Sequence, residues 1–154
     1  MQVLKLILLI SLFGPCMKVQ CQIVFERTYG SMQEERGEGI IQLPDSSYIV
    51  VGSTSSFGDL STDVLMLKLD SLGEVIWTKT RGGSNVDRGM EIIATSDAHL
   101  AIIGYTNSFG HGGYDVRFLK MDYNGSIIQS RTYGGANWDL GYSIAETADG
   151  GVLE

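Results

Sequence analysis

Cysteine is nearly absent, since the chain has only Cys16 and Cys21, both within its first twenty-one residues. This leader has an early lysine and an apolar run over residues 6–14, far below the roughly 20 residues of a membrane-spanning helix. We therefore expect residues 1–21 to be a signal peptide cleaved after Cys21. The alternative is a lipoprotein acylated at Cys16 or Cys21. Cleavage would leave no thiol and no disulfide, so that packing and hydrogen bonds alone would hold the mature fold.

Basic residues are also scarce. After residue 21, nine lysines and arginines face eighteen acidic residues, a net charge of −9. Nucleic acids and anionic membrane surfaces both demand clustered positive charge, so neither is expected as a partner, and no membrane insertion is expected after cleavage. No cofactor is expected, although calcium is compatible with this charge, as are neutral glycans. We expect a secreted or cell-surface protein, outer-membrane association included.

Helical periodicity is missing and prolines number only two, whereas a repeat of 52 residues is plain. Aligning residues 23–74 with 75–126 needs no gap and gives 18 identical positions, and a third, incomplete row follows from residue 127. Turn residues divide the second row into four short segments, which we predict as strands over 91–95, 99–105, 115–121 and 126–132. Asn124-Gly125 predicts a type I′ hairpin turn between the last two.

Four strands per repeat predict an all-β fold, a β-propeller of four-stranded antiparallel blades. Residues 49–51 and 100–103 are apolar at consecutive positions, as in sheets that are covered on both faces. The predicted units are an N-terminal strand and junction loop at 22–36, blade 1 with its junction loop at 37–88, blade 2 with its junction loop at 89–140, and the first strand of a third blade at 141–154.

Two blades and part of a third make a partial propeller, because a ring takes at least four blades. We expect a truncated chain, or a unit that needs partners, with the remaining blades of the intact chain closing the ring. Residues 23–29 match the fourth strand of a blade whose first three strands do not precede them. We expect this strand to complete a blade that lies beyond residue 154.

The motifs suggest a family. Thr-Tyr-Gly-Gly at 132–135, Trp-Asp-x-Gly at 138–141, Ser-Phe-Gly at 108–110 and Tyr-Asp-Val at 114–116 together resemble the propeller repeats of large secreted bacterial proteins. Many members of that group carry a C-terminal sorting domain, and some carry endoglucanase-type labels. Residues 70–77 also resemble, more distantly, the tryptophan-docking motif of quinoprotein propellers. The resemblance implies a propeller and says little about activity.

Candidate functional residues lie in the loops that we expect at one end of the blades, where the junction loops and the loops from second to third strands emerge together. The junctions contain the acidic and amide positions of a ligand or calcium face, in which each Asp would bind a cation or a polyol, or would fix the turn by accepting backbone N–H bonds. Within the blades, aromatic rings would stack on sugars or pack the loop between blades, and Tyr105 is a further candidate. The ligand or calcium candidates are Asn85, Asp87, Asn137, Trp138 and Asp139, and the aromatic candidates are Phe57, Phe109 and Tyr114.

No catalytic residue is predicted. The two histidines, His99 and His111, are not repeated and have no serine or acid partner evident in the sequence. The favoured function is therefore a non-catalytic extracellular scaffold that binds polysaccharide or a surface protein. The alternative is a propeller enzyme, a glycan hydrolase or a quinoprotein-like oxidoreductase, with its active site in the missing blades.

Overall fold

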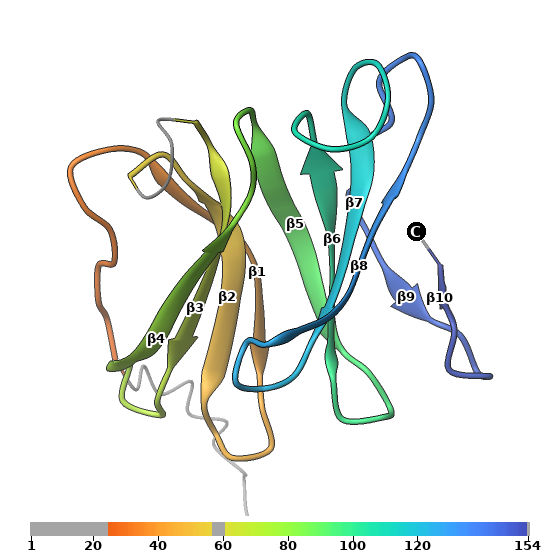
Figure 1. Cartoon of the computed structure of the whole chain (residues 1–154). Coiled ribbons are helices and arrows are strands. Elements are labelled where there is room, and N and C mark those ends of the chain that lie inside the picture. Colours follow the sequence, from red (N-terminus) through yellow and green to blue (C-terminus); the bar gives the residue numbers. More distant parts are fainter. Residues whose placement is uncertain (1–24, 57–60, 154) are drawn as a thin grey trace, which may run out of the picture.

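Two four-stranded antiparallel sheets follow each other along the chain in the computed structural model, which describes residues 25–56 and 61–153 (Figure 1). Sheet 1 has the order β1-β2-β3-β4 and sheet 2 the order β5-β6-β7-β8, and a short hairpin of β10 and β9 comes last. The strands are β1 Glu35–Gln42, β2 Tyr48–Thr54, β3 Asp63–Leu69, β4 Val75–Arg81, β5 Asp87–Ala94, β6 Leu100–Thr106, β7 Asp115–Met121, β8 Ile127–Tyr133, β9 Ala145–Glu146 and β10 Val152–Leu153. The all-β prediction with four strands per repeat is thus confirmed.

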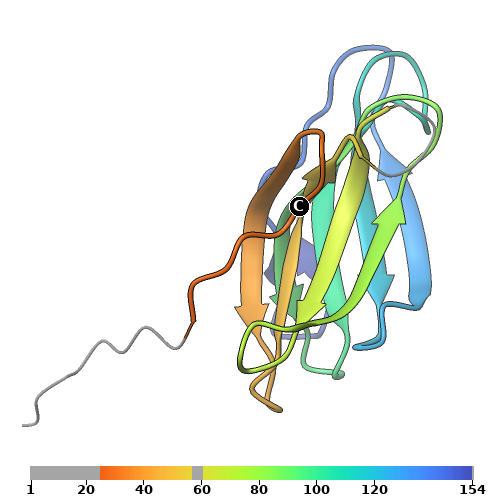
Figure 2. The same cartoon turned by 90° about the vertical axis from the view of Figure 1, so that its left-hand side faces the viewer.

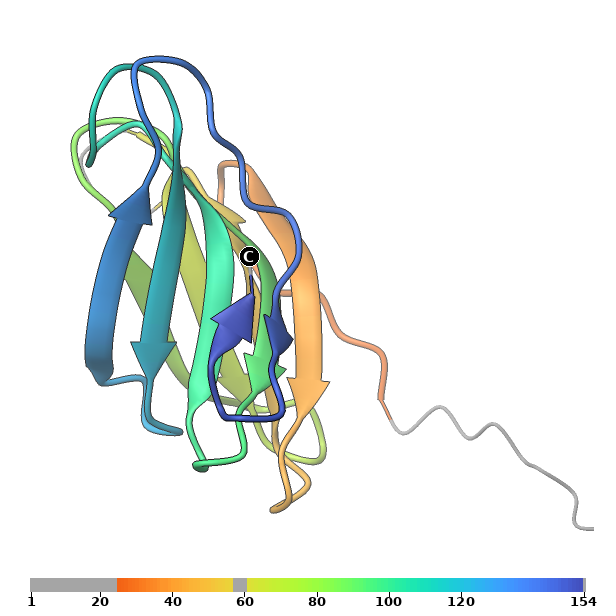
Figure 3. The ribbon, with the colours of Figure 1, turned by 90° about the vertical axis from the view of Figure 1, so that its right-hand side faces the viewer.

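The three units lie face to face as layers, with sheet 2 between sheet 1 and the hairpin (Figures 1 and 3). One core forms between the two sheets, and a smaller one between sheet 2 and the residues that lead into the hairpin. Along β6, Leu100 and Ile102 belong to the first core, and Ala101 and Ile103 to the second. Successive side chains of a strand point to opposite faces, so the consecutive apolar run means that both faces are covered, as the sequence predicted.

Each sheet begins two residues earlier than the predicted blade boundary, at Glu35 and Asp87. In both sheets the first strand contains an irregularity, which lies between Gly37 and Gly39 in β1 and between Gly89 and Glu91 in β5. The bulge lets the residues before it continue the ladder, so that Asp87 pairs with Thr106. Glu35 and Asp87 are therefore each held at the start of a strand.

The turn between β7 and β8 is a hairpin as predicted, but its type is not I′. Only Gly125 has a positive φ, of 76°, whereas a type I′ turn needs one at Asn124 as well. Asp122 directs the turn instead, because its Oδ1 accepts the backbone N–H groups of Asn124 and Ser126 at 2.9 and 2.8 Å. Asp70 occupies the same position in sheet 1 and makes the same two bonds. The type I′ prediction did not take account of the Asp122 side chain, which accepts the backbone N–H groups of the turn.

The N-terminal residues 25–34 belong to none of the β-ladders between the described strands. They lie on the face of sheet 1 that is turned away from sheet 2 (Figure 2). The expected signal peptide, residues 1–21, lies outside the described residues. At the other end, the region expected to hold one strand contains the β9 and β10 hairpin, with Gly150 at a φ of 81° in its turn.

Candidate functional site

The first junction, residues 82–86 between β4 and β5, is fixed by the side chain of Asp87. Its Oδ2 accepts the backbone N–H of Gly83 at 2.9 Å and the hydroxyl of Ser108 at 2.6 Å. Asp87 is 1% exposed, and its Oδ1 has no hydrogen-bond partner among the described residues. These bonds are those of a carboxylate that fixes a turn and joins it to the loop between β6 and β7.

Asn85 uses its polar groups in the same way. Its Nδ2 donates to the carbonyl oxygen of Asn107, and its backbone N–H donates to Ser108 Oγ, both at 3.0 Å. The junction and the loop from second to third strand therefore touch at one end of the sheets, as predicted (Figure 1).

The same arrangement recurs one repeat away in each direction. Glu35 accepts the backbone N–H of Ser31 at 3.1 Å, and Asp139 accepts that of Gly135 at 2.9 Å. Hydrogen bonds, above all from the hydroxyl of Ser56, lower the pKa of Glu35. The repeated acid thus performs one structural task three times, in which it holds the junction turn that precedes it.

The second junction, residues 134–138 after β8, lies where aromatic rings that are distant in the sequence come together. Tyr114 packs edge to face against Trp138 at 5.3 Å between centroids and against Tyr105 at 5.4 Å. Tyr105 in turn packs against Tyr142 at 6.3 Å. Trp138 is 71% exposed and Tyr142 59% exposed, whereas burial raises the pKa of Tyr105. We call these four residues the aromatic cluster.

A shallow pocket of about 500 Å³ lies beside the aromatic cluster. Tyr142 lines it together with Asp139 from the junction and Tyr133 from the end of β8. Two phenol rings and a carboxylate around one recess offer both a stacking surface and hydrogen-bonding groups to a polar ligand.

The predicted site residues fall into two groups, one at each junction. Asn85, Asp87 and Phe109 belong to the first, and Tyr114, Trp138 and Asp139 to the second, with the exposed Asn137 beside them. The loop over residues 107–114 links the groups, because its first residues contact the first junction and its last residues the second. Tyr142 was missed, although its replacement of Met90 of the preceding row is a signal that comparison of rows gives.

Phe109 packs against the first junction and does not stand free. The guanidinium carbon of Arg117 lies 4.2 Å from its ring centroid, and a side chain at Gly83 would meet its ring edge at 3.3 Å. It remains 40% exposed. Phe57, its equivalent in the first repeat, lies outside the described residues.

Both histidines lie in loops or turns of sheet 2. The backbone N–H of His111 donates to Asp115 Oδ2 at 2.8 Å and so closes the loop before β7. His99 lies in the first hairpin of sheet 2, where its Nδ1 is 3.2 Å from Asp97 Oδ2. Asp97 Oδ2 also accepts a hydrogen bond from the ammonium group of Lys120 at 2.6 Å. In sheet 1, Nζ of Lys68 lies 3.8 Å from Oδ2 of Asp45.

Replacing Asp97 with Asn is expected to reduce the loss of unfolding free energy that occurs as the pH is lowered. The hydrogen bond from Lys120, followed by that from Thr95, lowers the pKa of Asp97 strongly. Because the pKa of Asp97 is lower in the folded state than in the unfolded state, where it is about 3.9, ionised Asp97 stabilises the fold at a pH above about 3.9. This stabilisation is lost as the pH falls toward the pKa of the folded state. Urea unfolding between about pH 5 and pH 2 should show a smaller loss in the variant. Asp149→Asn, in the same turn of the next repeat but without a lysine partner among the described residues, is the control.

A scan against protein-family models finds no match for this chain, and a search of curated proteins finds none either. Among residues 25–56 and 61–153, no three His, Cys, Asp or Glu side chains are grouped so that they could hold a metal ion. The described part of the chain also contains no helix that is long and apolar enough to cross a membrane.

Proposed function

We propose that this chain is part of a non-catalytic extracellular β-propeller whose loop-rich end binds polysaccharide. The propeller is supported by the 52-residue repeat, by two blade-like sheets packed face to face, and by the start of a third unit on the far face of sheet 2. The resemblance to secreted bacterial repeats and the signal-like leader support an extracellular or cell-surface location. The net charge favours a neutral ligand over a polyanion.

The aromatic cluster is the observation that carries polysaccharide binding. Trp138 and Tyr142 are both largely exposed and Tyr142 lines the recess, an arrangement that favours stacking on the apolar faces of sugar rings. The positions equivalent to the four rings one repeat earlier are Ser53, Thr62, Val86 and Met90. The scaffold does not require aromatic residues at these positions, because the preceding repeat forms the same sheet without them.

The test is binding of the whole chain to an array of neutral polysaccharides, β-glucans included, followed by titration of the best ligand. We expect Trp138→Ala and Tyr142→Ala each to weaken binding about tenfold, which corresponds to roughly 1.4 kcal/mol of lost contact. Ile128→Ala is the matched control, because Ile128 is 53% exposed on β8 and outside the cluster. It should leave the affinity unchanged.

Equal affinities for all three variants would contradict the assignment of the cluster. Absence of binding on the array, together with hydrolysis of a β-glucan that a single carboxylate substitution abolishes, would favour a glycan hydrolase.

A further inference from the structure

The N-terminal segment, residues 25–30, is attached to sheet 1 by side-chain contacts. Arg27 Nε donates to the carbonyl oxygen of Leu72 at 3.2 Å, and the hydroxyl of Tyr29 donates to that of Gly73 at 2.8 Å. The ring of Phe25 packs edge to face on Tyr48 at 5.8 Å. The segment thus has a defined place over the turn that joins β3 and β4.

The same contacts recur 52 residues later, between the two sheets. Lys79, the equivalent of Arg27, donates from Nζ to the carbonyl oxygen of Asn124 at 2.6 Å, and Asn124 is the equivalent of Leu72. Trp77, the equivalent of Phe25, lies close to Gly125 as Phe25 lies close to Gly73. Lys79 and Trp77 belong to β4. Residues 25–30 are therefore placed against sheet 1 in the same way that β4, the fourth strand of sheet 1, is placed against sheet 2.

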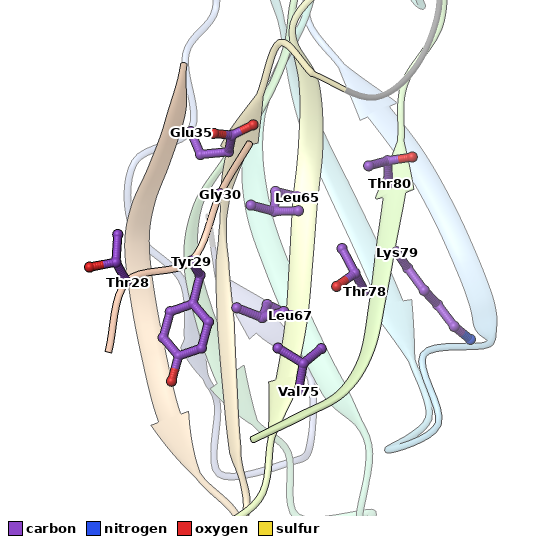
Figure 4. Close-up of a pocket in the computed structure, with 10 residues that line it drawn as sticks. All are labelled: Thr28, Tyr29, Gly30, Glu35, Leu65, Leu67, Val75, Thr78, Lys79 and Thr80. Carbon is purple, nitrogen blue, oxygen red and sulfur yellow. The ribbon is translucent and has the colours of Figure 1, made fainter. Parts of the chain in front are cut away.

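One difference separates the two cases. β4 pairs along its length with β3, whereas no described strand pairs with residues 25–30. At this place a pocket of about 580 Å³ lies between the segment and sheet 1 (Figure 4). Thr28 and Tyr29 line it on one side, and Leu65, Leu67 and Val75 on the other.

We propose that this pocket is a docking site for one β-strand, the third strand of another blade of the same repeat type. The established interface between the sheets supports this occupant. There, Val64 and Met66 of the third strand β3 pack into one core with Leu119 of sheet 2, and Leu119 is the equivalent of the pocket residue Leu67. A strand in the pocket would add to the free edge of residues 25–29 and bury its apolar side chains against Leu67.

The repeat also fixes the register of the docked strand. Leu65 pairs with Thr80 in sheet 1, and Arg117 pairs with Thr132 in sheet 2. Thr28 is the equivalent of both threonines, so it should lie opposite the residue two positions after the Asp that begins the docked strand. This docking site rests on the proposed propeller scaffold, and its test is independent of sugar binding.

Disulfide trapping tests the site and its register together. The full chain, with Cys16 and Cys21 replaced by Ser, receives Thr28→Cys and is mixed under mild oxidation with synthetic nine-residue peptides of the sequence of residues 62–70. Each peptide carries one cysteine, in place of Val64, Leu65 or Met66. Directly opposed strand residues have the Cα separation that a disulfide requires, and their neighbours point to the other face. We expect at least fivefold more product with the peptide that carries cysteine at the Leu65 position.

Thr132→Cys is the matched control, because it occupies the same repeat position but already pairs with β7. It should give at least fivefold less product than Thr28→Cys. Equal product with all three peptides, or with both chain variants, would overturn the proposal. Disulfide-linked dimers of the Thr28→Cys chain formed in preference to peptide adducts would also overturn it, since a second copy would then cover this face.

Discussion

Gly104→Ala should lower the free energy of unfolding by about 3 kcal/mol, one of the two largest effects expected of a single substitution in this chain. Gly104 lies in β6 opposite Gly89 of β5, next to the bulge. A Cβ at this position would overlap the carbonyl oxygen of Arg88 and lie 2.8 Å from its carbonyl carbon and 3.0 Å from Gly89 Cα. These are backbone atoms of a paired strand, so that relief requires β5 to move away from β6.

Urea denaturation at neutral pH measures this loss, with Gly135→Ala as the control. Among the described residues, none besides its two chain neighbours would come within 4 Å of a Cβ at Gly135, so its replacement should change stability by no more than about 0.5 kcal/mol. The slope of the unfolding free energy with urea should stay the same in both variants. A loss below about 1 kcal/mol for Gly104→Ala would mean that the close approach of the two strands is not required.

Gly104 illustrates how much of the fold the sequence predicts. The repeat places Gly52 and Gly104 at one position, and the structure gives both the same overlap with the preceding strand. Strand number, strand order and the double coverage of β6 follow from apolar runs and turn residues, because these are local signals that a 52-residue period reinforces. The face that gathers the loops follows from the antiparallel order.

Side-chain contacts that fix the turns and junctions could not be predicted in this way. The sequence of Asn124-Gly125 suggested a type I′ turn, but Asp122 competes for its backbone and changes the turn type. The sequence likewise gave no sign that Ser108 donates to Asp87 across 21 residues. Tyr142 joins the aromatic cluster only because the junction folds back over Tyr105. Regular positions thus predict the scaffold, and departures from the repeat mark candidate sites.

Asp87→Ala should cost about 3 kcal/mol of stability, the second of the large effects. The substitution removes the acceptor of two charge-assisted hydrogen bonds, from the N–H of Gly83 and the hydroxyl of Ser108, at a position that is 1% exposed. Both donors would then be left without this acceptor, and a buried unsatisfied donor costs about 1 to 3 kcal/mol. Asp139→Ala is the matched variant, because Asp139 accepts one bond from Gly135 and is half-buried, so that it should cost only about 1 kcal/mol.

The same pair of variants separates the turn-fixing role of Asp87 from calcium binding. Calcium prefers six to eight oxygen ligands, whereas Oδ2 of Asp87 is already occupied by two donors. We therefore expect the thermal midpoint of the parent chain to be the same in 1 mM calcium and in a chelator, and the loss caused by Asp87→Ala to be the same in both. A ligand that binds the folded state raises its stability by mass action. A calcium-dependent rise in the parent that disappears in Asp87→Ala but persists in Asp139→Ala would instead place a calcium ion at the free Oδ1 of Asp87.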